Sequence, residues 1–338
     1  MTEGAREFGV AVLGAGRMGQ THLRNLAAIP GVRVEVVVDP DAAAAEAGRA
    51  LARGRRASSD HLEAINDPAV DAVVIVTNTA THAPLIEASL RGGKAVWSEK
   101  PIALDLAETA RIVDLWRETG LPVQIGFMRR FDPGYERAKQ LVDSGDLGRI
   151  EQFRALSRDT FPPSLHFLLG SGGSFLDMAV HDLDLARFLV GEVEEVHAWA
   201  AVLFDDRFTQ ADDFDTAVTM LRFQNGALGV VETARHSEWG YDIRTEVAGA
   251  VGKVVVDGGQ KTPATHLRQF AAEGDRYIDF PDRFEVAYRR ELEAFFEDLA
   301  AGRTPSPGPD DALETLRLAV AVTRSWREGR PVRVAEVG

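Results

Sequence analysis

Apolar residues in the first third of the chain occur as short continuous runs separated by amphipathic stretches. Apolar runs of roughly four to eight residues are typical of strands buried on both faces of a parallel sheet. Apolar residues spaced three and four apart are typical of helices packed on such a sheet. The expected strands are Phe8–Leu13, Val32–Val38, Val70–Thr77, Ala95–Trp97 and Val123–Gly126, and the expected helices include Asp41–Arg53, Asp60–Asn66 and Asp105–Glu118.

From Phe127 onward the pattern changes to an alternation of apolar and polar residues. Such alternation, broken by turn sequences such as Gln224-Asn225-Gly226, is typical of antiparallel strands with one solvated face. The expected strands are Ile150–Arg158, Val193–Phe204, Ala217–Phe223, Ala227–Arg235, Arg244–Gly249 and Gly252–Val256, and the expected helices are Gly134–Ser144, Phe284–Ala301 and Asp310–Glu328.

The two patterns predict an α/β protein with two domains, which 338 residues are enough to form. Residues 1–125 are expected to form an N-terminal Rossmann domain with a doubly wound parallel sheet. Residues 126–338 are expected to form a C-terminal α+β domain with a large, mostly antiparallel sheet; the family resemblance given below implies that this sheet is open and that the domain serves substrate binding and oligomerisation. The last helix, 310–328, is a candidate to pack back on the N-terminal domain.

The segment Gly14-Ala-Gly-Arg-Met-Gly19 lies between the first expected strand and the first expected helix. Gly14 permits a tight turn, Gly16 lets the backbone approach a pyrophosphate, and Gly19 lets the helix pack close to the strand. The helix N-terminus then faces the phosphate charge. Asp39 ends the next strand, twenty positions after Gly19, where a carboxylate accepts hydrogen bonds from ribose hydroxyls. This context predicts a dinucleotide-binding site.

Asp39 also bears on the choice of dinucleotide. Its carboxylate would repel a 2′-phosphate, and no arginine directly follows it to accept one. NAD is therefore expected as the cofactor, and NADP is less favoured.

Further candidate residues lie at the ends of the later parallel strands, beyond which ligands of open α/β sheets bind. Lys100 has a second interpretation as a solvated loop lysine, but its position at a strand end beside a proline favours the site. His82 has a second interpretation as a structural helix-capping residue. The expected cofactor-binding residues are Gly14, Gly16, Arg17, Met18, Gly19, Asp39, Thr77, Asn78, His82, Glu99 and Lys100.

Chemistry is expected on the stretch from Gly172 to Asp184, where apolar residues spaced three and four apart predict an amphipathic helix that ends near Gly191. Asp177 and His181 are four residues apart, which on an α-helix places their Cβ atoms roughly 5–6 Å apart. A carboxylate one turn from an imidazole can fix its tautomer and stabilise its charged form, as a proton acceptor for an alcohol requires. The alternative interpretation is a polar helix face, since Asp182 and Asp184 lie in the same stretch.

Composition excludes several classes of function. The chain contains no cysteine, so thiol catalysis and disulfides are excluded, and zinc would have to rely on histidine and carboxylate ligands. No metal site is expected. A formal net charge of −14 argues against nucleic-acid binding, which needs a basic surface. No apolar run approaches the roughly 20 residues of a membrane helix, and the N-terminus lacks the apolar core of a secretory signal. A cytoplasmic protein without membrane partners is expected.

Four motifs occur in order along the chain: Gly14–Gly19, Glu99-Lys-Pro101, Gly126-Phe-Met-Arg-Arg-Phe-Asp132 and Gly172-Gly-Ser-Phe-Leu-Asp-Met-Ala-Val-His181. With them the chain resembles the glucose-fructose oxidoreductase / inositol dehydrogenase / rhizopine catabolism (Gfo/Idh/MocA) family over nearly its whole length. It is most similar to the myo-inositol 2-dehydrogenase branch, through Ser157-Arg-Asp159, Pro162-Pro163 and the Asp177/His181 helix.

The resemblance implies an NAD-dependent dehydrogenase that acts on an inositol or a related polyol or sugar, with Lys100, Asp177 and His181 as the catalytic set. Lys100 would stabilise negative charge developing on the reacting oxygen. His181 would take the hydroxyl proton, and Asp177 would orient substrate and histidine. It also implies a homodimer or homotetramer supported by the open sheet, and a cis peptide between Lys100 and Pro101.

Arg130, Asp159 and Tyr241 are the expected ligands of further polyol hydroxyls, which a site must satisfy with donors and acceptors. Arg129 is expected to point away, because alternation along a strand turns only one of two successive residues inward. Two departures bear on the identity of the sugar. Ala179 stands where relatives in the inositol branch often have a hydroxyl residue, and His166-Phe167 stands near the position of a tyrosine.

Three other functions fit the same fold. An NADP-linked sugar or aldose dehydrogenase would need an arginine beside Asp39. A non-catalytic nucleotide sensor would be expected to have lost part of the set of lysine, aspartate and histidine, whereas all three residues are present. Redox-assisted elimination would require tightly held NAD.

Overall fold

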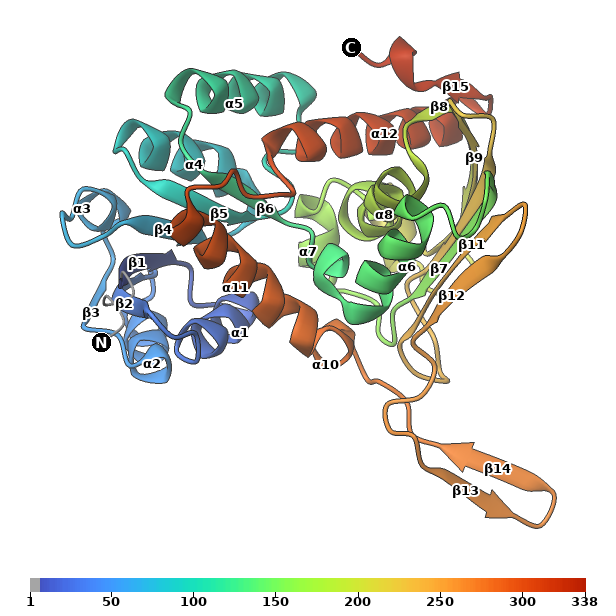
Figure 1. Ribbon diagram of the computed structural model, residues 1–338, viewed down its shortest axis with the longest axis horizontal. Coiled ribbons are helices and arrows are strands. Elements are labelled where there is room, and N and C mark those ends of the chain that lie inside the picture. Colours follow the sequence, from blue (N-terminus) through green and yellow to red (C-terminus); the bar gives the residue numbers. More distant parts are fainter. Residues whose placement is uncertain (1–6) are drawn as a thin grey trace. The chain divides into compact units, whose positions relative to one another are not determined.

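The computed structural model describes residues 7–338 (Figure 1). Residues 1–6, which make up most of the N-terminal segment considered above for a signal sequence, lie outside the described residues. Contacts divide the chain into two compact units. Of the described residues, 7–128 and 286–314 form the first unit, and 129–285 and 315–338 form the second.

The first unit contains a six-stranded sheet with the order β3-β2-β1-β4-β5-β6, and the neighbouring strands are parallel. This order is that of a dinucleotide-binding Rossmann sheet, so the predicted parallel sheet is confirmed. The strands are β1 (Phe8–Leu13), β2 (Val32–Val38), β3 (Arg56–Ser58), β4 (Ala72–Ile75), β5 (Ala95–Glu99) and β6 (Val123–Gly126).

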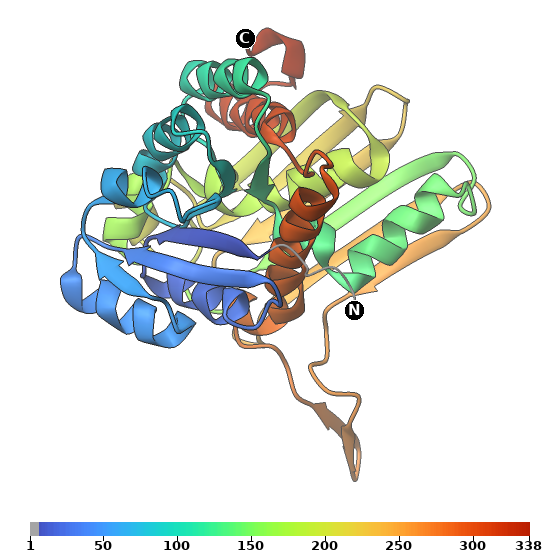
Figure 2. The same ribbon diagram turned by 60° about the vertical axis from the view of Figure 1, so that its left-hand side comes forward.

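Helices cover both faces of this sheet, with α1 and α2 on one side and α4 and α5 on the other (Figures 1 and 2). Several begin at an aspartate whose carboxylate accepts hydrogen bonds from the first turn, such as Asp41 at α2 and Asp105 at α5. The elements are α1 (Arg17–Leu26), α2 (Ala42–Ala52), α3 (His61–Ile65), the short η1 (Thr79–Thr81), α4 (His82–Arg91) and α5 (Leu106–Thr119).

Most of helix α11 (Glu285–Ala301) belongs to this first unit. Leu292, Phe295 and Phe296 are buried in the core that also contains Phe8 and Leu23. The sequence pattern assigned this helix to the second domain, since an amphipathic repeat shows that a helix has an apolar face but not which core receives it.

The second unit contains a seven-stranded sheet with the order β12-β11-β7-β10-β9-β8-β15. It is mixed and mostly antiparallel, as predicted, but β7 and β10 pair in parallel. The strands are β7 (Ile150–Arg158), β8 (Val193–Ala201), β9 (Thr216–Phe223), β10 (Leu228–Ala234), β11 (Asp242–Gly249), β12 (Lys253–Asp257) and β15 (Val332–Arg333).

Helices α6 and α8 lie against one face of this sheet (Figure 1). Alternate residues on its strands are exposed although they are apolar, including Trp199, Met220 and Leu228, each more than half exposed. A hairpin formed by β13 (Thr265–Arg268) and β14 (Ala271–Gly274) extends from the sheet and was not predicted. The other elements are α6 (Pro133–Asp143), α7 (Leu165–Gly170), α8 (Val180–Val190), α9 (Arg207–Gln210), α10 (Phe280–Arg283), α12 (Pro309–Glu328) and η4 (Val334–Glu336).

Two local predictions were wrong. Residues 172–184 do not form one regular α-helix, because Phe175–Ala179 is a π-helical segment (η3) that leads into α8. Residues 128–131 form a 3₁₀ helix (η2) instead of continuing a strand. Among residues 7–338, no helix is long and apolar enough to cross a membrane.

Glu291 on α11 is a fully buried carboxyl group in the first unit. Neither of its carboxyl oxygens has a hydrogen-bond partner among residues 7–338. Burial raises the pKa of Glu291 well above its ordinary value, and the charge of Glu99 raises it further. The folded state therefore holds a proton on Glu291 that the unfolded chain releases.

This proton makes stability depend on pH. Because the folded pKa is raised, stability is fully present below the ordinary glutamate pKa of 4.5 and is lost as pH rises toward the folded value. Replacing Glu291 by glutamine removes this loss, so the stability difference between variant and wild type should grow above pH 4.5 by at most about 1.4 kcal/mol per pH unit.

Thermal unfolding from pH 4 to pH 9 measures this difference. Glu297→Gln, at an exposed position of the same helix, is the matched control and should change little. A Glu291→Gln advantage that is independent of pH would contradict the assignment of a protonated Glu291.

Candidate functional site

The turn from β1 into α1 needs glycine at two positions, Gly14 in the loop and Gly19 in the first turn of α1. Gly14 has a φ of +102°, and a Cβ there would lie 2.4 Å from the carbonyl oxygen of Val76. A Cβ on Gly19 would lie 2.3 Å from the carbonyl oxygen of Gly14. The chain can therefore make this turn, and bring α1 against β1, only without side chains at these two positions.

Gly16 differs from both. A Cβ built on Gly16 meets nothing within 4 Å, and its φ of −67° suits any residue. Gly16 is also the N-cap of α1 and provides no side-chain acceptor, and the first turn contains no acidic residue. The open space and the helix N-terminus are what a closely approaching pyrophosphate requires, so the loop fits the expected dinucleotide.

Asp39, at the end of β2, is attached to this loop. Its Oδ2 accepts a hydrogen bond of 2.9 Å from the amide of Ala15, and its Oδ1 accepts one of 2.9 Å from the amide of Asp41. A carboxylate has about four acceptor positions, so these contacts orient it without filling it. The arrangement suits an acceptor for two ribose hydroxyls.

His82 connects the ends of two strands in the first unit. One of its ring nitrogens, Nδ1, lies 2.8 Å from the carbonyl oxygen of Pro101, and Nε2 lies 3.0 Å from that of Thr77. The ring is buried, which favours a structural role. Through these contacts it holds the segment after Lys100, whose peptide with Pro101 is cis as the resemblance implied.

Glu99 is held at the end of β5 by a histidine that the sequence did not single out. Its Oε1 lies 3.1 Å from Nε2 of His22, and its Oε2 accepts a hydrogen bond of 3.3 Å from the amide of Lys100. The His22 ring is buried against Trp97, with ring centroids 4.6 Å apart. The contact with the buried His22 therefore fixes the position of the Glu99 carboxylate, next to the candidate Lys100.

In the second unit, Asp177 lies in the π-helical segment and His181 in the first turn of α8. The separation of roughly 5–6 Å expected for the Cβ atoms of this pair assumed a regular α-helix, whereas the segment that contains Asp177 is π-helical. The Oδ2 of Asp177 accepts a hydrogen bond of 2.7 Å from Nη2 of Arg235. Both Asp177 and His181 are half-buried.

Arg235 is a candidate site residue that the sequence analysis missed. It follows β10 directly, and its guanidinium is buried. Besides Asp177, it donates from Nη1 to Oδ2 of Asp159 at 3.1 Å and from Nε to Oγ of Ser174 at 3.2 Å. The only signal for it in the sequence was a basic residue at the end of an expected strand.

Burial lowers the pKa of the Arg235 guanidinium, but the facing charges of Asp177 and Asp159 outweigh burial and raise it above the ordinary arginine value. The pKa of Asp159 is also raised, because burial of its carboxyl group outweighs the attraction of Arg235. The charge of Asp177 raises it further. The structure therefore brings two of the expected site carboxylates to one arginine.

Arg129 and Arg130 both point into the protein, so the expectation that Arg129 points away was wrong. The expectation assumed a strand, whereas the 3₁₀ helix η2 does not alternate its side chains between two faces. Arg129 donates to Asp182 at 2.6 Å. Arg130 donates to both oxygens of Asp184, at 2.6 and 2.9 Å.

Tyr241, which precedes β11, is buried. Burial raises the pKa of its hydroxyl, an effect that the charge of Arg129 and a hydrogen bond from it only partly offset, and the charges of Asp159 and Asp182 raise it further. Tyr241 is therefore a neutral hydroxyl at ordinary pH. Tyr241 is close enough to Asp159 for the charge of that carboxylate to affect its pKa.

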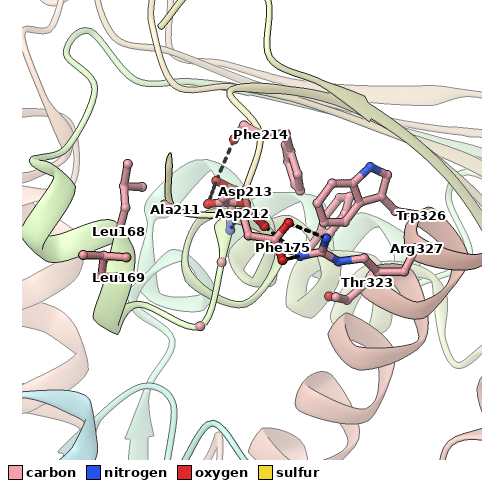
Figure 3. A pocket seen from close by; sticks show the side chains of 13 residues that line it. Leu168, Leu169, Phe175, Ala211, Asp212, Asp213, Phe214, Thr323, Trp326 and Arg327 are labelled. Carbon is pink, nitrogen blue, oxygen red and sulfur yellow. Dashed lines mark hydrogen bonds and ion pairs between the residues drawn. The ribbon is translucent and has the colours of Figure 1, made fainter. Parts of the chain in front are cut away.

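A cavity of about 200 Å³ lies beside the start of the π-helical segment (Figure 3). Gly172, Gly173 and Ser174 form part of its wall. Asp213 in the same wall accepts hydrogen bonds from the amide and the hydroxyl of Ser174, at 3.1 and 2.8 Å. Among residues 7–338, no group of three or more histidine, cysteine or acidic side chains is arranged to hold a metal ion.

Two family descriptions match the chain. Residues 8–127 match an oxidoreductase family with an NAD-binding Rossmann fold, and residues 135–255 match the Gfo/Idh/MocA C-terminal domain. The cofactor of the first unit is therefore NAD, in agreement with the glycine loop.

Curated relatives resemble the chain over nearly their whole length. It is 38% identical over 326 residues to the scyllo-inositol 2-dehydrogenase (NAD(+)) of Bacillus subtilis, covering 96% of this chain and 95% of the relative. It is 36% identical over 330 residues to the myo-inositol 2-dehydrogenase of Thermotoga maritima, covering 97% and 99%. A crystal structure of scyllo-inositol dehydrogenase from Lactobacillus casei with bound NAD(H) and scyllo-inositol has a TM-score of 0.92 at 27% identity, covering 98% of this chain and all of that chain.

The contrast between Gly14 and Gly16 gives a prediction. Gly16→Ala should leave the stability of the cofactor-free protein unchanged, because its methyl group enters open space, and should weaken NAD binding by at least about tenfold, or 1.4 kcal/mol. Gly14→Ala should instead destabilise the protein by at least about 1 kcal/mol.

Calorimetric NAD titration and thermal unfolding without cofactor measure the two effects. Gly170→Ala serves as a control for the substitution itself, since its Cβ also meets nothing within 4 Å and its φ is not positive, but it ends α7 in the second unit. NAD affinity unchanged in Gly16→Ala would place the pyrophosphate elsewhere.

Proposed function

The chain belongs to the Gfo/Idh/MocA oxidoreductase family, and from this premise we propose that it oxidises a CH–OH group of an inositol or a related cyclic polyol or sugar. The observation that carries the proposal is the similarity to inositol 2-dehydrogenases across almost the entire length of both chains. A relationship of this extent includes both the NAD-binding unit and the unit that carries the other candidate residues.

The polar groups of the second unit support a polyol substrate. A cyclic polyol presents many hydroxyls, and each one buried in a site needs a partner. Asp159, Asp177 and Tyr241 offer two carboxylates and a neutral hydroxyl close to the buried cations Arg129 and Arg235. Arg130, by contrast, already makes a two-point contact with Asp184, so it serves the proposed substrate less directly.

Lys100, His181 and Asp177 form the proposed catalytic set. Lys100 follows β5 at the carboxyl edge of the Rossmann sheet, where ligands of this fold bind. Its ammonium would hydrogen-bond the reacting hydroxyl and stabilise developing negative charge on the oxygen. The imidazole of His181 would accept the hydroxyl proton, and the Asp177 carboxylate would hold substrate and histidine in register.

NAD, when bound, supplies the acceptor for the hydride that leaves the carbon atom. The loop residues from Gly14 to Gly19 and the carboxylate of Asp39 would hold it, together with Thr77, Asn78 and Glu99 at the strand ends. The exposed apolar face of the second sheet supports the expected homodimer or homotetramer.

The proposed catalytic set predicts the behaviour of two variants. Lys100→Met and His181→Ala should each lower kcat with myo- or scyllo-inositol by about 10²–10⁴-fold, because each removes a group that acts on the reacting hydroxyl. NAD binding should persist in both. NADH absorbance with a panel of inositols and aldoses measures turnover, and Lys94→Met is a matched control on a loop lysine bonded to backbone carbonyls. Wild-type turnover in either variant would contradict the mechanism.

The preference for NAD predicts a further change. Asp39→Ala removes the carboxylate that would accept ribose hydrogen bonds and repel a 2′-phosphate, so the ratio of kcat/KM for NAD over NADP should fall by at least about tenfold. Asp41→Ala is the control, since this neighbouring carboxylate caps α2 and should affect stability but not the ratio. An unchanged ratio in Asp39→Ala would show that the ribose contact lies elsewhere.

A further inference from the structure

Arg235 and Asp159 meet because β7 and β10 are parallel neighbours. The register pairs Ala234 with Arg158, and the next residue on each strand is Arg235 or Asp159. The amide of Asp159 donates to the carbonyl of Ala234 at 3.0 Å, which continues the ladder past the strand ends. The carboxyl ends of parallel strands lie at the same edge of a sheet, so this pairing places the cation beside the carboxylate.

The guanidinium of Arg235 donates from all three of its nitrogens, to two side chains of the π-helical segment and its N-cap and to one side chain that follows β7. Nη2 reaches Asp177 in the π-helical segment at 2.7 Å, and Nη1 reaches Asp159 after β7 at 3.1 Å. Nε reaches Ser174 at 3.2 Å. A guanidinium is planar and rigid, so one group fixes the relative position of the two carboxylates.

Ser174 is itself fixed by hydrogen bonds to Asp213. Both its amide and its hydroxyl contact the buried carboxylate of Asp213, which lies in the wall of the cavity in Figure 3. The Nε end of the Arg235 guanidinium is therefore bound to a side chain that is itself fixed by the buried Asp213. A side chain supported in this way can direct its partners as well as neutralise them.

We propose that Arg235 is a positioning residue for the dehydrogenase reaction: it holds Asp177 and Asp159 side by side as acceptors for two hydroxyl groups of one polyol. The inference rests on the proposed function, because it assigns the second unit's carboxylates to the substrate. Two carboxylates this close to one cation would otherwise repel each other. The charge of Arg235 opposes that repulsion, and their charges in turn keep it cationic.

Arg235→Lys tests the proposal because lysine keeps the charge but loses the planar fork, so it cannot hold both carboxylates in one plane. We expect kcat/KM for the inositol substrate to fall at least tenfold, with a higher KM for the polyol. The KM for NAD and the melting temperature should stay close to the wild-type values. Arg244→Lys is the matched control, since Arg244 lies in the same sheet but pairs with Asp242 on its own strand.

A double-mutant cycle measures the coupling in kcat/KM between Arg235 and Asp159, which an arginine with only a structural role would not show. If Arg235 acts through Asp159, the losses in kcat/KM from Arg235→Lys and Asp159→Asn should be clearly non-additive, with the double variant little worse than the weaker single variant. Additive losses would overturn the positioning role. So would wild-type kinetics in Arg235→Lys, or a loss confined to NAD affinity and melting temperature.

Should Arg235→Lys fail to fold, Ser174→Ala replaces it, because this change removes the support at Nε and leaves both carboxylate contacts. It is expected to raise the KM for the polyol, and an unchanged KM would overturn the inference. Failure of the proposed function looks different: no inositol or aldose in the panel would then be turned over by the wild-type protein at all. If the wild-type protein turns over an inositol and Arg235→Lys leaves kcat/KM and the KM for the polyol unchanged, only the positioning role is rejected.

Discussion

Both units depend on one constraint of β-structure: parallel strands that pair side by side end at a common edge, and whatever follows each strand is brought together there. In the first unit this edge gathers the glycine loop, Asp39 and the segment before Lys100. The second sheet is mostly antiparallel, yet its one parallel pairing, between β7 and β10, joins Asp159 to Arg235. Polar residues that are distant in sequence become neighbours at both places for the same reason.

The first unit could be predicted from sequence in some detail because its requirements are local. Gly14 and Gly19 are fixed by a positive φ or a backbone contact that any Cβ would violate, and such requirements are visible in a short motif. The parallel sheet followed from the alternation of apolar runs and helices, whereas the short edge strand β3 (Arg56–Ser58), which contains no apolar run, was not predicted. What the sequence did not reveal was that α11 returns to this unit, since an apolar helix face does not specify its partner.

The second unit was predicted only at the level of its class. Alternation identified most of the strands, but the parallel pairing of β7 with β10 depends on long-range topology that no periodicity records. The network around Arg235 joins residues 58 and 76 positions apart in sequence, so it was not visible from spacing. The 3₁₀ helix at Met128–Phe131 likewise removed the basis for choosing between Arg129 and Arg130.

The wider turn at Phe175–Ala179 has a consequence for how Asp177 and His181 are directed. A π-turn holds one residue more per hydrogen-bonded loop than an α-turn, so it acts as a one-residue insertion that rotates everything before it by roughly 100° about the axis. Asp177 lies inside this turn and His181 follows it in α8, so the angle between the two side chains differs from that of an uninterrupted α-helix. A deletion of one residue here would rephase the acidic side chain while leaving the rest of α8 in place.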